Sequence, residues 1–218
     1  MLCGFFIWQN MITLNVRADI YQVLAKVNRI KEGVVDKAIV AALNKTAAKG
    51  KTEMVRQITN EYNIKAKDVR PQITVSKASR KTNKLEITIR AFGVRRGHRS
   101  RNVMLFDAKQ VPGNGPPKRV NVQFPDGQWR SIIVREGGGV SVKIKRNGGR
   151  KLIPHAFIAN KGRTVFMRIP GTNKIKAVET VDVPQMFNTR RVYDAVLEKI
   201  KQEFPVEMER AVRLYSSK

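Results

Sequence analysis

Hydrophobic side chains recur along this chain at two spacings, one typical of strands and one typical of helices. Residues 12–16 and 85–92 place them at every second position, which predicts strands with one buried face. Residues 34–62 place them three and four positions apart, which predicts a long helix. A second helix is predicted over residues 188–215, where Pro205 should either kink the helix or begin a new helical segment.

Shorter patterns complete the predicted order of elements. Residues 18–30 have helical spacing, and residues 72–78 alternate like a strand that forms a hairpin with 84–92. Residues 152–171 predict two short strands around a turn at residues 161–163, and a further strand ends at Pro184. Helices, then many strands, then a helix predict an α+β fold, a mostly antiparallel β-sheet packed by a long N-terminal helix and a C-terminal helix.

The middle of the chain differs in composition from both ends. The segment of about residues 94–150 is made up of the arginine-rich "GVRRGHRSRN", the irregular "VPGNGPPKR" and the glycine-bounded "REGGGVSVKIKRNGGRK", which predicts a hairpin. We interpret this segment as a Gly/Arg-rich β insertion within a single domain that spans residues 11–218. Gly50 lies inside the predicted long helix, where it marks a weak point or a close approach of another element.

The charge of the chain predicts an anionic partner. The 218 residues hold 43 lysines and arginines against 17 aspartates and glutamates, a net charge of +26, and 42% of them are apolar, which is enough for a core. Over half of the excess lies in residues 90–163, with seventeen basic and three acidic groups. The partner is either nucleic acid or an acidic neighbour. A subunit that lies beside nucleic acid without binding a particular sequence explains the charge equally well.

Eight basic side chains are the candidates for contact with DNA phosphates or with an acidic partner. They lie in the arginine-rich loop and in the glycine-bounded segment: Arg95, Arg96, Arg99, Arg101, Lys143, Lys145, Arg146 and Arg150.

Catalytic chemistry has little support in this sequence. The only histidines are His98 and His155, and the acidic residues of the middle segment have no paired spacing. The single cysteine, Cys3, excludes a disulfide framework and a cysteine-cluster zinc site. "EGGGVS" lacks the Lys-Ser/Thr ending of a phosphate-binding loop. We therefore expect no enzyme, no metal site and no cofactor.

The first ten residues, "MLCGFFIWQN", form an apolar leader. A membrane span needs about 20 apolar residues, so the leader is too short to cross a bilayer, and we expect no membrane partner. Either it is an upstream start that is not used, with Met11 as the true start, or it docks on a neighbouring subunit through its large apolar side chains, Phe5, Phe6, Ile7 and Trp8.

The turn at Lys161-Gly162 tests for an RNA-binding strand. Such a strand requires an aromatic residue directly after the glycine, but Arg163 and Thr164 follow here. The pattern therefore fails, and we predict that Phe157 and Phe166 are core residues instead.

The same segment resembles a known family. "RKLIPHAFIANKGRTVFMRI", then "VPQMFNTRRVYDAVLEKIKQEFPVEMERAVRL", and upstream the Ala-x-Asn-Lys of the long helix, are similar to the minor tail protein Z family of long-tailed bacteriophages, also called tail completion proteins. The resemblance covers roughly residues 34–92 and 150–216. Ten positions carry the C-terminal motif: Ile153, Pro154, Ala156, Phe157, Ile158, Gly162, Met167, Arg168, Phe204 and Pro205.

The resemblance implies a structural, non-enzymatic virion protein at the head-proximal end of the tail or the neck. It implies a homo-oligomeric ring, with six-fold symmetry or a multiple, assembled in the host cytoplasm. The implied neighbours are the tail terminator, the tail tube or tape measure, head–tail connector proteins and genomic DNA in the channel. The alternative from another class is a free basic protein that binds nucleic acid without sequence preference. An enzyme acting on nucleic acid would need a cluster of acidic metal ligands, which the sequence lacks.

Overall fold

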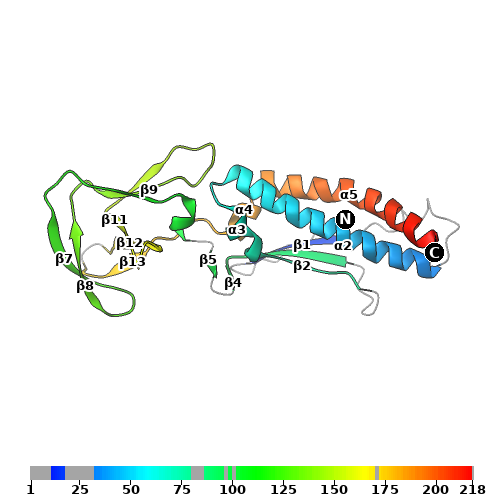
Figure 1. The fold of residues 1–218 in the computed structure, drawn as a ribbon, viewed down its shortest axis with the longest axis horizontal. Coiled ribbons are helices and arrows are strands. Elements are labelled where there is room, and N and C mark those ends of the chain that lie inside the picture. The colour runs from blue at the N-terminus through cyan, green and yellow to red at the C-terminus, as the bar shows by residue number, and fades with distance from the viewer. Residues whose placement is uncertain are drawn as a thin grey trace. The chain divides into compact units, whose positions relative to one another are not determined.

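The computed structural model describes residues 11–17, 32–79, 86–95, 98–99, 102–169 and 172–217. Two long helices and many short antiparallel strands confirm the predicted α+β class (Figure 1). The leader and the helix predicted over residues 18–30 lie outside the described residues.

The helices and strands follow the predicted order closely. The helical segments are α2 (Glu32–Glu61), α3 (Ala66–Val69), α4 (Val183–Phe187), α5 (Arg190–Ser216) and the 3-10 turns Arg70–Gln72 and Val103–Phe106. The strands are β1 (Met11–Arg17), β2 (Ile73–Ser76), β3 (Glu86–Phe92), β4 (Val94–Arg95), β5 (His98–Arg99), β6 (Lys109–Val111), β7 (Lys118–Gln123), β8 (Trp129–Val134), β9 (Gly139–Val142), β10 (Lys151–Pro154), β11 (Ala156–Ala159), β12 (Thr164–Arg168) and β13 (Ile175–Ala177).

The chain separates into two compact units. The first holds the described residues of Met1–Ile58, Val69–His98 and Val183–Lys218, and the second holds those of Thr59–Asp68 and Arg99–Asp182. The single domain inferred from the sequence stays a prediction, and each unit is described by itself.

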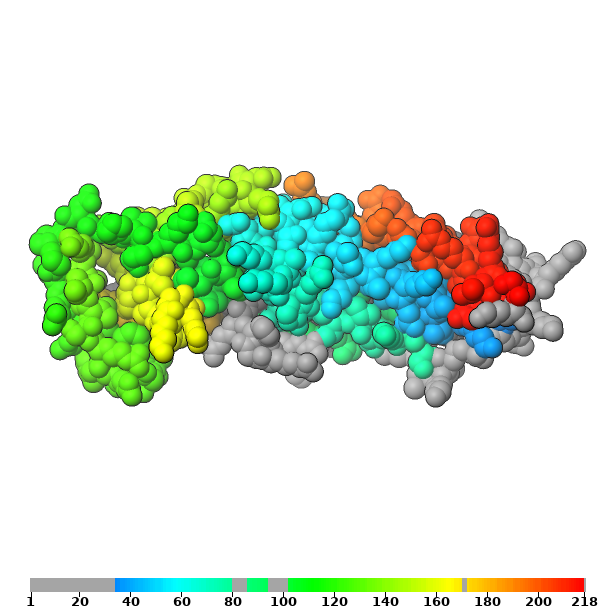
Figure 2. All heavy atoms as spheres, viewed as in Figure 1, coloured from blue at the N-terminus to red at the C-terminus, as the bar shows by residue number. Residues whose placement is uncertain are grey.

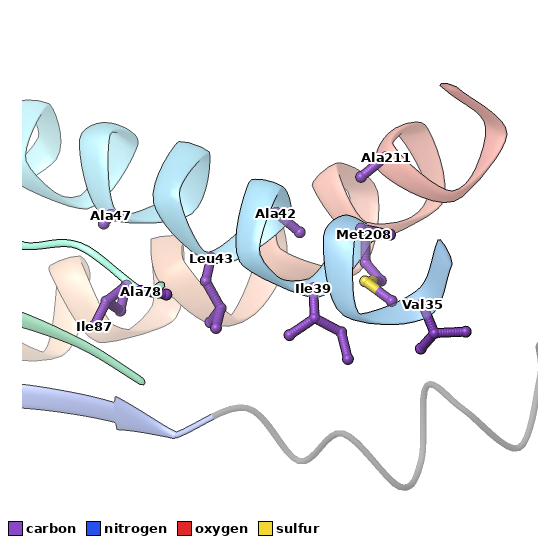
Figure 3. Packing of buried hydrophobic residues seen from close by; sticks show 10 residues of the cluster. Val35, Ile39, Ala42, Leu43, Ala47, Ala78, Ile87, Met208 and Ala211 are labelled. Carbon is purple, nitrogen blue, oxygen red and sulfur yellow. The ribbon is translucent and has the colours of Figure 1, made fainter. Parts of the chain in front are cut away.

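The first unit is a three-stranded antiparallel sheet, in the order β1-β3-β2, with the long helices packed on it. The register places Leu14 and Val75 on either side of Ile89 in the central strand. The apolar stripe predicted along the long helix is buried, and Figure 3 shows Leu43 and Ile87 among the side chains of this core, with Met208 of α5. Burial of these side chains removes apolar surface from water, which is the main force that holds the helices on the sheet.

Gly50 marks the closest approach within this unit. A Cβ atom at this position would lie 3.0 Å from the Cδ1 atoms of both Ile200 of α5 and Ile89 of β3. The glycine of α2 therefore lets a second helix and the sheet come close at one point. Of the two roles considered for it, close approach is confirmed.

Both prolines near the C-terminus lie inside helices and do not end an element. Pro184 was predicted to end a strand, but it lies in the first turn of α4, where a proline needs no hydrogen-bond partner for its nitrogen. Pro205 lies inside α5, which continues as one helix to Ser216. Pro205 is exposed, so water can reach the backbone carbonyl that the proline leaves without a donor.

The second unit contains three small antiparallel sheets, in the orders β10-β9-β6, β11-β12-β13 and β7-β8. The turn between β11 and β12 forms where the sequence predicted it, and Gly162 takes a positive φ of 77° there. Residues 153–158 do not form one core strand as predicted. His155, with a φ of 59°, separates β10, which pairs with β9, from β11, which pairs with β12.

Two apolar clusters stabilise the second unit. One contains Val140 of β9 and Val165 of β12, and the other contains Val122 of β7 and Phe166 of β12. Because alternate residues of a strand point to opposite faces, Val165 and Phe166 place β12 between the two clusters. Phe157 packs against the second cluster, so the structure confirms that Phe157 and Phe166 belong to the core.

Candidate functional site

The eight candidate basic residues divide into two groups. Arg95 and Arg99 lie in the short paired strands β4 and β5, whose side chains are not described. Arg96 and Arg101 lie outside the described residues, as do the candidate docking residues Phe5, Phe6, Ile7 and Trp8. The other four basic residues lie in the second unit, and their side chains are described.

Arg150 connects Asp107, which follows a 3-10 turn, to Ser141 of β9. Its Nη1 donates to Asp107 Oδ2 at 2.6 Å, and its Nη2 donates to the Asp107 carbonyl at 2.6 Å and the Ser141 carbonyl at 2.9 Å. Its Nε donates to Ser141 Oγ at 2.9 Å. All three guanidinium nitrogens therefore have partners in the chain, and this fixes Asp107, after the 3-10 turn, against β9.

Asp107 is the acidic centre of this cluster. The hydrogen bond from Arg150 is the largest effect that lowers the pKa of the Asp107 carboxyl, and the positive charges of Lys109 and Lys143 lower it further. The carboxylate therefore stays ionised and neutralises part of the local positive charge.

Lys145 and Arg146 contact the last turn of α2, which belongs to the second unit. Lys145 Nζ lies 3.3 Å from Glu61 Oε1, and Arg146 Nε donates to the Thr59 carbonyl at 2.9 Å. A positive charge at a helix C-terminus is favourable, because the last carbonyls of a helix lack backbone donors. Lys145, Arg146 and Arg150 thus have structural contacts, and their contact with a phosphate or an acidic partner stays a prediction.

A second set of cations has no such contacts. Nine lysine and arginine side chains of the second unit are exposed and have no hydrogen-bond or ion-pair partner among the described residues. They are Lys65, Lys67, Arg119, Arg135, Lys151, Lys161, Arg163, Lys174 and Lys176. None of them is among the eight candidates from the sequence, because they differ from those eight only in the distance to the nearest acidic group in space.

The motif residues of the C-terminal half have mainly structural positions. Ala156 is buried, and Ile153, Ile158 and Met167 pack against the same cluster. Phe204 packs against the core of the first unit, whereas Pro154, Gly162 and Pro205 are exposed. Arg168 is half-buried, and its Nε and Nη2 atoms are buried without a hydrogen-bond partner among the described residues.

Asn44, from the Ala-x-Asn-Lys segment of α2, bonds to a single residue in both directions. Its Nδ2 donates to the Ala78 carbonyl at 3.1 Å, and its Oδ1 accepts from the Ala78 N–H at 2.9 Å. The side-chain amide therefore satisfies both backbone groups of Ala78, as a neighbouring strand would.

The described residues offer no metal site of the usual kind. No group of three or more His, Cys, Asp or Glu side chains among them could hold a metal ion. No helix in the described part of the chain is long and apolar enough to span a membrane.

The comparison with family models identifies the chain. The model of Prophage minor tail protein Z (GPZ) matches residues 20–216. The chain belongs to this family. Searches of curated proteins and of solved structures found no match. The family match also covers the segment between the two parts of the chain that carry the resemblance, so the basic segment lies within the family's extent.

Membership of the minor tail protein Z family identifies this chain as a structural protein of a bacteriophage tail. The contacts described for its side chains serve packing and positioning. Asn44 and the motif residues of β11 and β12 hold elements together, and the exposed cations of the second unit remain the candidate contact surface.

Proposed function

We propose that the protein is a tail completion or neck subunit that forms a ring at the head-proximal end of the phage tail. In this role it helps tail maturation, the joining of head and tail, and the passage of DNA. The observation that supports the proposal most strongly is the family match over residues 20–216, nearly the whole chain.

The distribution of charge supports a position beside DNA. Residues 102–182 hold fifteen lysines and arginines against five aspartates and glutamates, whereas residues 183–217 hold six against five. Nine cations of the second unit have no described partner and are free to contact phosphates. Such contacts do not depend on base sequence, which suits a protein that every part of a genome must pass.

A ring strengthens the effect of these charges. Each copy adds its own cations, and fields that add inside a narrow channel stay significant despite screening by salt. The proposed neighbours are the tail terminator, the tail tube or tape measure and the head–tail connector, with assembly in the host cytoplasm. We propose no catalytic step, because the contacts described for the acidic and basic groups are structural.

Disruption of the gene in a lysogen tests this role. We expect induced cells to produce heads and tails that electron microscopy shows unjoined or of abnormal tail length, and the wild-type gene supplied in trans should restore them. Normal, joined and infectious particles without the protein would overturn the proposal.

The exposed cations provide a second test in the same system. Replacement of Lys161, Arg163, Lys174 and Lys176 by serine should lower infectivity without loss of the protein from particles. Lys201→Ser, on an exposed position of α5, is the matched control. A salt titration of DNA binding by the isolated monomer separates this role from that of a free DNA-binding protein, which would bind tightly at low salt.

A further inference from the structure

The hairpin β7–β8 has one face turned to the core and one face turned to solvent. Val122 is buried on the inner face, where Arg130 lies over the Phe124 ring with its guanidinium carbon 4.4 Å from the ring centroid. The pairs on the opposite face point outward: Arg119 with Ile133, Asn121 with Ser131, and Gln123 with Trp129. Figure 1 shows β7 and β8 running together at the margin of the second unit.

The outward face exposes two of the largest apolar side chains of the second unit. Trp129 is 57% exposed and Ile133 is 65% exposed, and both lie on β8. In Figure 2 the green atoms of the segment that forms β7 and β8 lie at the surface in view. Tryptophan, arginine and branched apolar residues that lie together on an exposed surface are typical of the centre of a protein–protein interface.

The outer edge of β8 is also open. β8 pairs only with β7, and its second edge has no backbone partner among the described residues. It ends in the apolar β-branched run Ile132–Val134. Proteins usually protect such an edge with lysine, proline or a bulge, because it readily accepts another strand. The run Ile132–Val134 has none of these protections.

The charges of the hairpin favour an acidic occupant. Glu136 is bonded to Lys118 at 2.9 Å, and Asp126 is bonded to Arg130, so the acidic groups of the hairpin are neutralised within it. Arg119 and Arg135 remain exposed and without a partner among the described residues. These two cations attract an acidic partner to the hairpin, and they repel a second copy of the same surface.

We propose that the outer face and open edge of β8 bind an extended, acidic segment of another protein by strand addition. Backbone hydrogen bonds along β8 would supply affinity, and Trp129, Ile133 and Arg119 would select alternating apolar and acidic side chains. The outer face holds one cation among neutral and apolar groups, which fits a protein better than a DNA backbone. The inference goes beyond the proposed function and does not depend on ring formation.

The test uses the full chain and three labelled probes. They are a short peptide of alternating valine and glutamate, the matching peptide of valine and lysine, and a short DNA duplex, each followed by fluorescence anisotropy. Trp129→Ser and Ile133→Lys alter the docking face, and both side chains are exposed enough for the fold to be retained, which circular dichroism checks. Leu152→Ser, at a 49% exposed position of β10 in the same unit, is the control.

We expect the valine–glutamate peptide to bind the wild-type chain and the Leu152→Ser variant, and both docking variants to weaken binding by more than about tenfold. The valine–lysine peptide should not bind. Unchanged binding by the docking variants would overturn the proposal. So would tighter binding of DNA that these variants abolish, or a dimer of the chain that dissociates when Ile133 is replaced.

Discussion

At the scale of single residues, Asn44 shows how one side chain can replace a strand. Its amide pairs with the N–H and the carbonyl of Ala78, which follows β2 and lies 4% exposed. Water cannot readily satisfy these backbone groups, so the bonds to Asn44 hold the chain against α2.

Replacement of Asn44 by alanine should therefore destabilise the protein. We expect a loss of about 1–3 kcal/mol in the free energy of unfolding, because the backbone groups of Ala78 lose their partner. Asn60→Ala is the control, since Asn60 is an exposed residue of the same helix and gains the same helix propensity. Denaturant unfolding measures both, and equal effects of the two substitutions would contradict this role.

Gly139 provides a second residue-scale prediction. A Cβ atom at this position of β9 would collide with the backbone carbonyl oxygen of Ile153 in the paired strand, which cannot rotate away. We expect Gly139→Ala to cost about 1–3 kcal/mol through strain. Gly149→Ala, where nothing lies within 4 Å of the added atom, should change stability by less than about 0.5 kcal/mol. A neutral Gly139→Ala in thermal unfolding would show that β9 and β10 can separate.

The sequence could not predict the partners of the cations. Arg150 is a candidate for contact with an anionic partner, and the sequence does not show that its guanidinium also bonds to Asp107 and Ser141. Arg119 and Lys161 have no partner among the described residues. In the sequence they are basic residues of the same basic part of the chain as Arg150. Proximity between residues distant along the chain decides the difference, and residue spacing does not contain it.

At the scale of elements, charged groups join α2 to α5 beside the apolar core. Lys49 of α2 donates to Glu203 Oε2 at 2.5 Å and to Glu207 Oε1 at 2.6 Å, and Lys199 lies 2.8 Å from Glu203. These contacts, first that of Lys199 and then that of Lys49, lower the pKa of Glu203 to about 2. Glu207 is buried, and the hydrogen bond from Lys49 lowers its pKa as well.

This network predicts a loss of stability in acid. Because the folded pKa of Glu203 lies below its ordinary value of 4.5, its contribution is complete above that pH and is lost as the pH falls toward about 2. Urea unfolding across this range should show the decline, and Glu203→Gln should make it shallower. Glu209→Gln, which removes an exposed carboxylate of the same helix, controls for net charge. An unaltered pH profile in Glu203→Gln would argue against the network.

Elements with strong periodicity were predictable, and those without it were not. The long helix was expected over 34–62 and forms as Glu32–Glu61, because a continuous apolar stripe packs on the sheet. The hairpin of β7 and β8 was not predicted. Its outward Trp129 and Ile133 break the alternation that normally marks a strand with one buried face. The break in the pattern therefore coincides with the surface that we propose binds a partner.

At the scale of the whole molecule, the family match and the distribution of charge support one account. The family model extends over residues 20–216 and includes the basic segment. The second unit carries most of the positive charge that has no partner among the described residues, while the helices of the first unit are close to neutral. A tail subunit with a packed frame and an electropositive unit can assemble through one part and meet DNA or acidic partners through the other.

The central claim is that this protein forms a ring at the head-proximal end of the tail. Reconstruction of complete phage particles by cryo-electron microscopy tests it most directly, with tagged copies of the chain to identify the density. We expect a closed ring of copies at the junction of tail and neck, with the second unit toward DNA or toward acidic neighbours. Copies found only at the distal tip, or their absence from finished particles, would contradict the account.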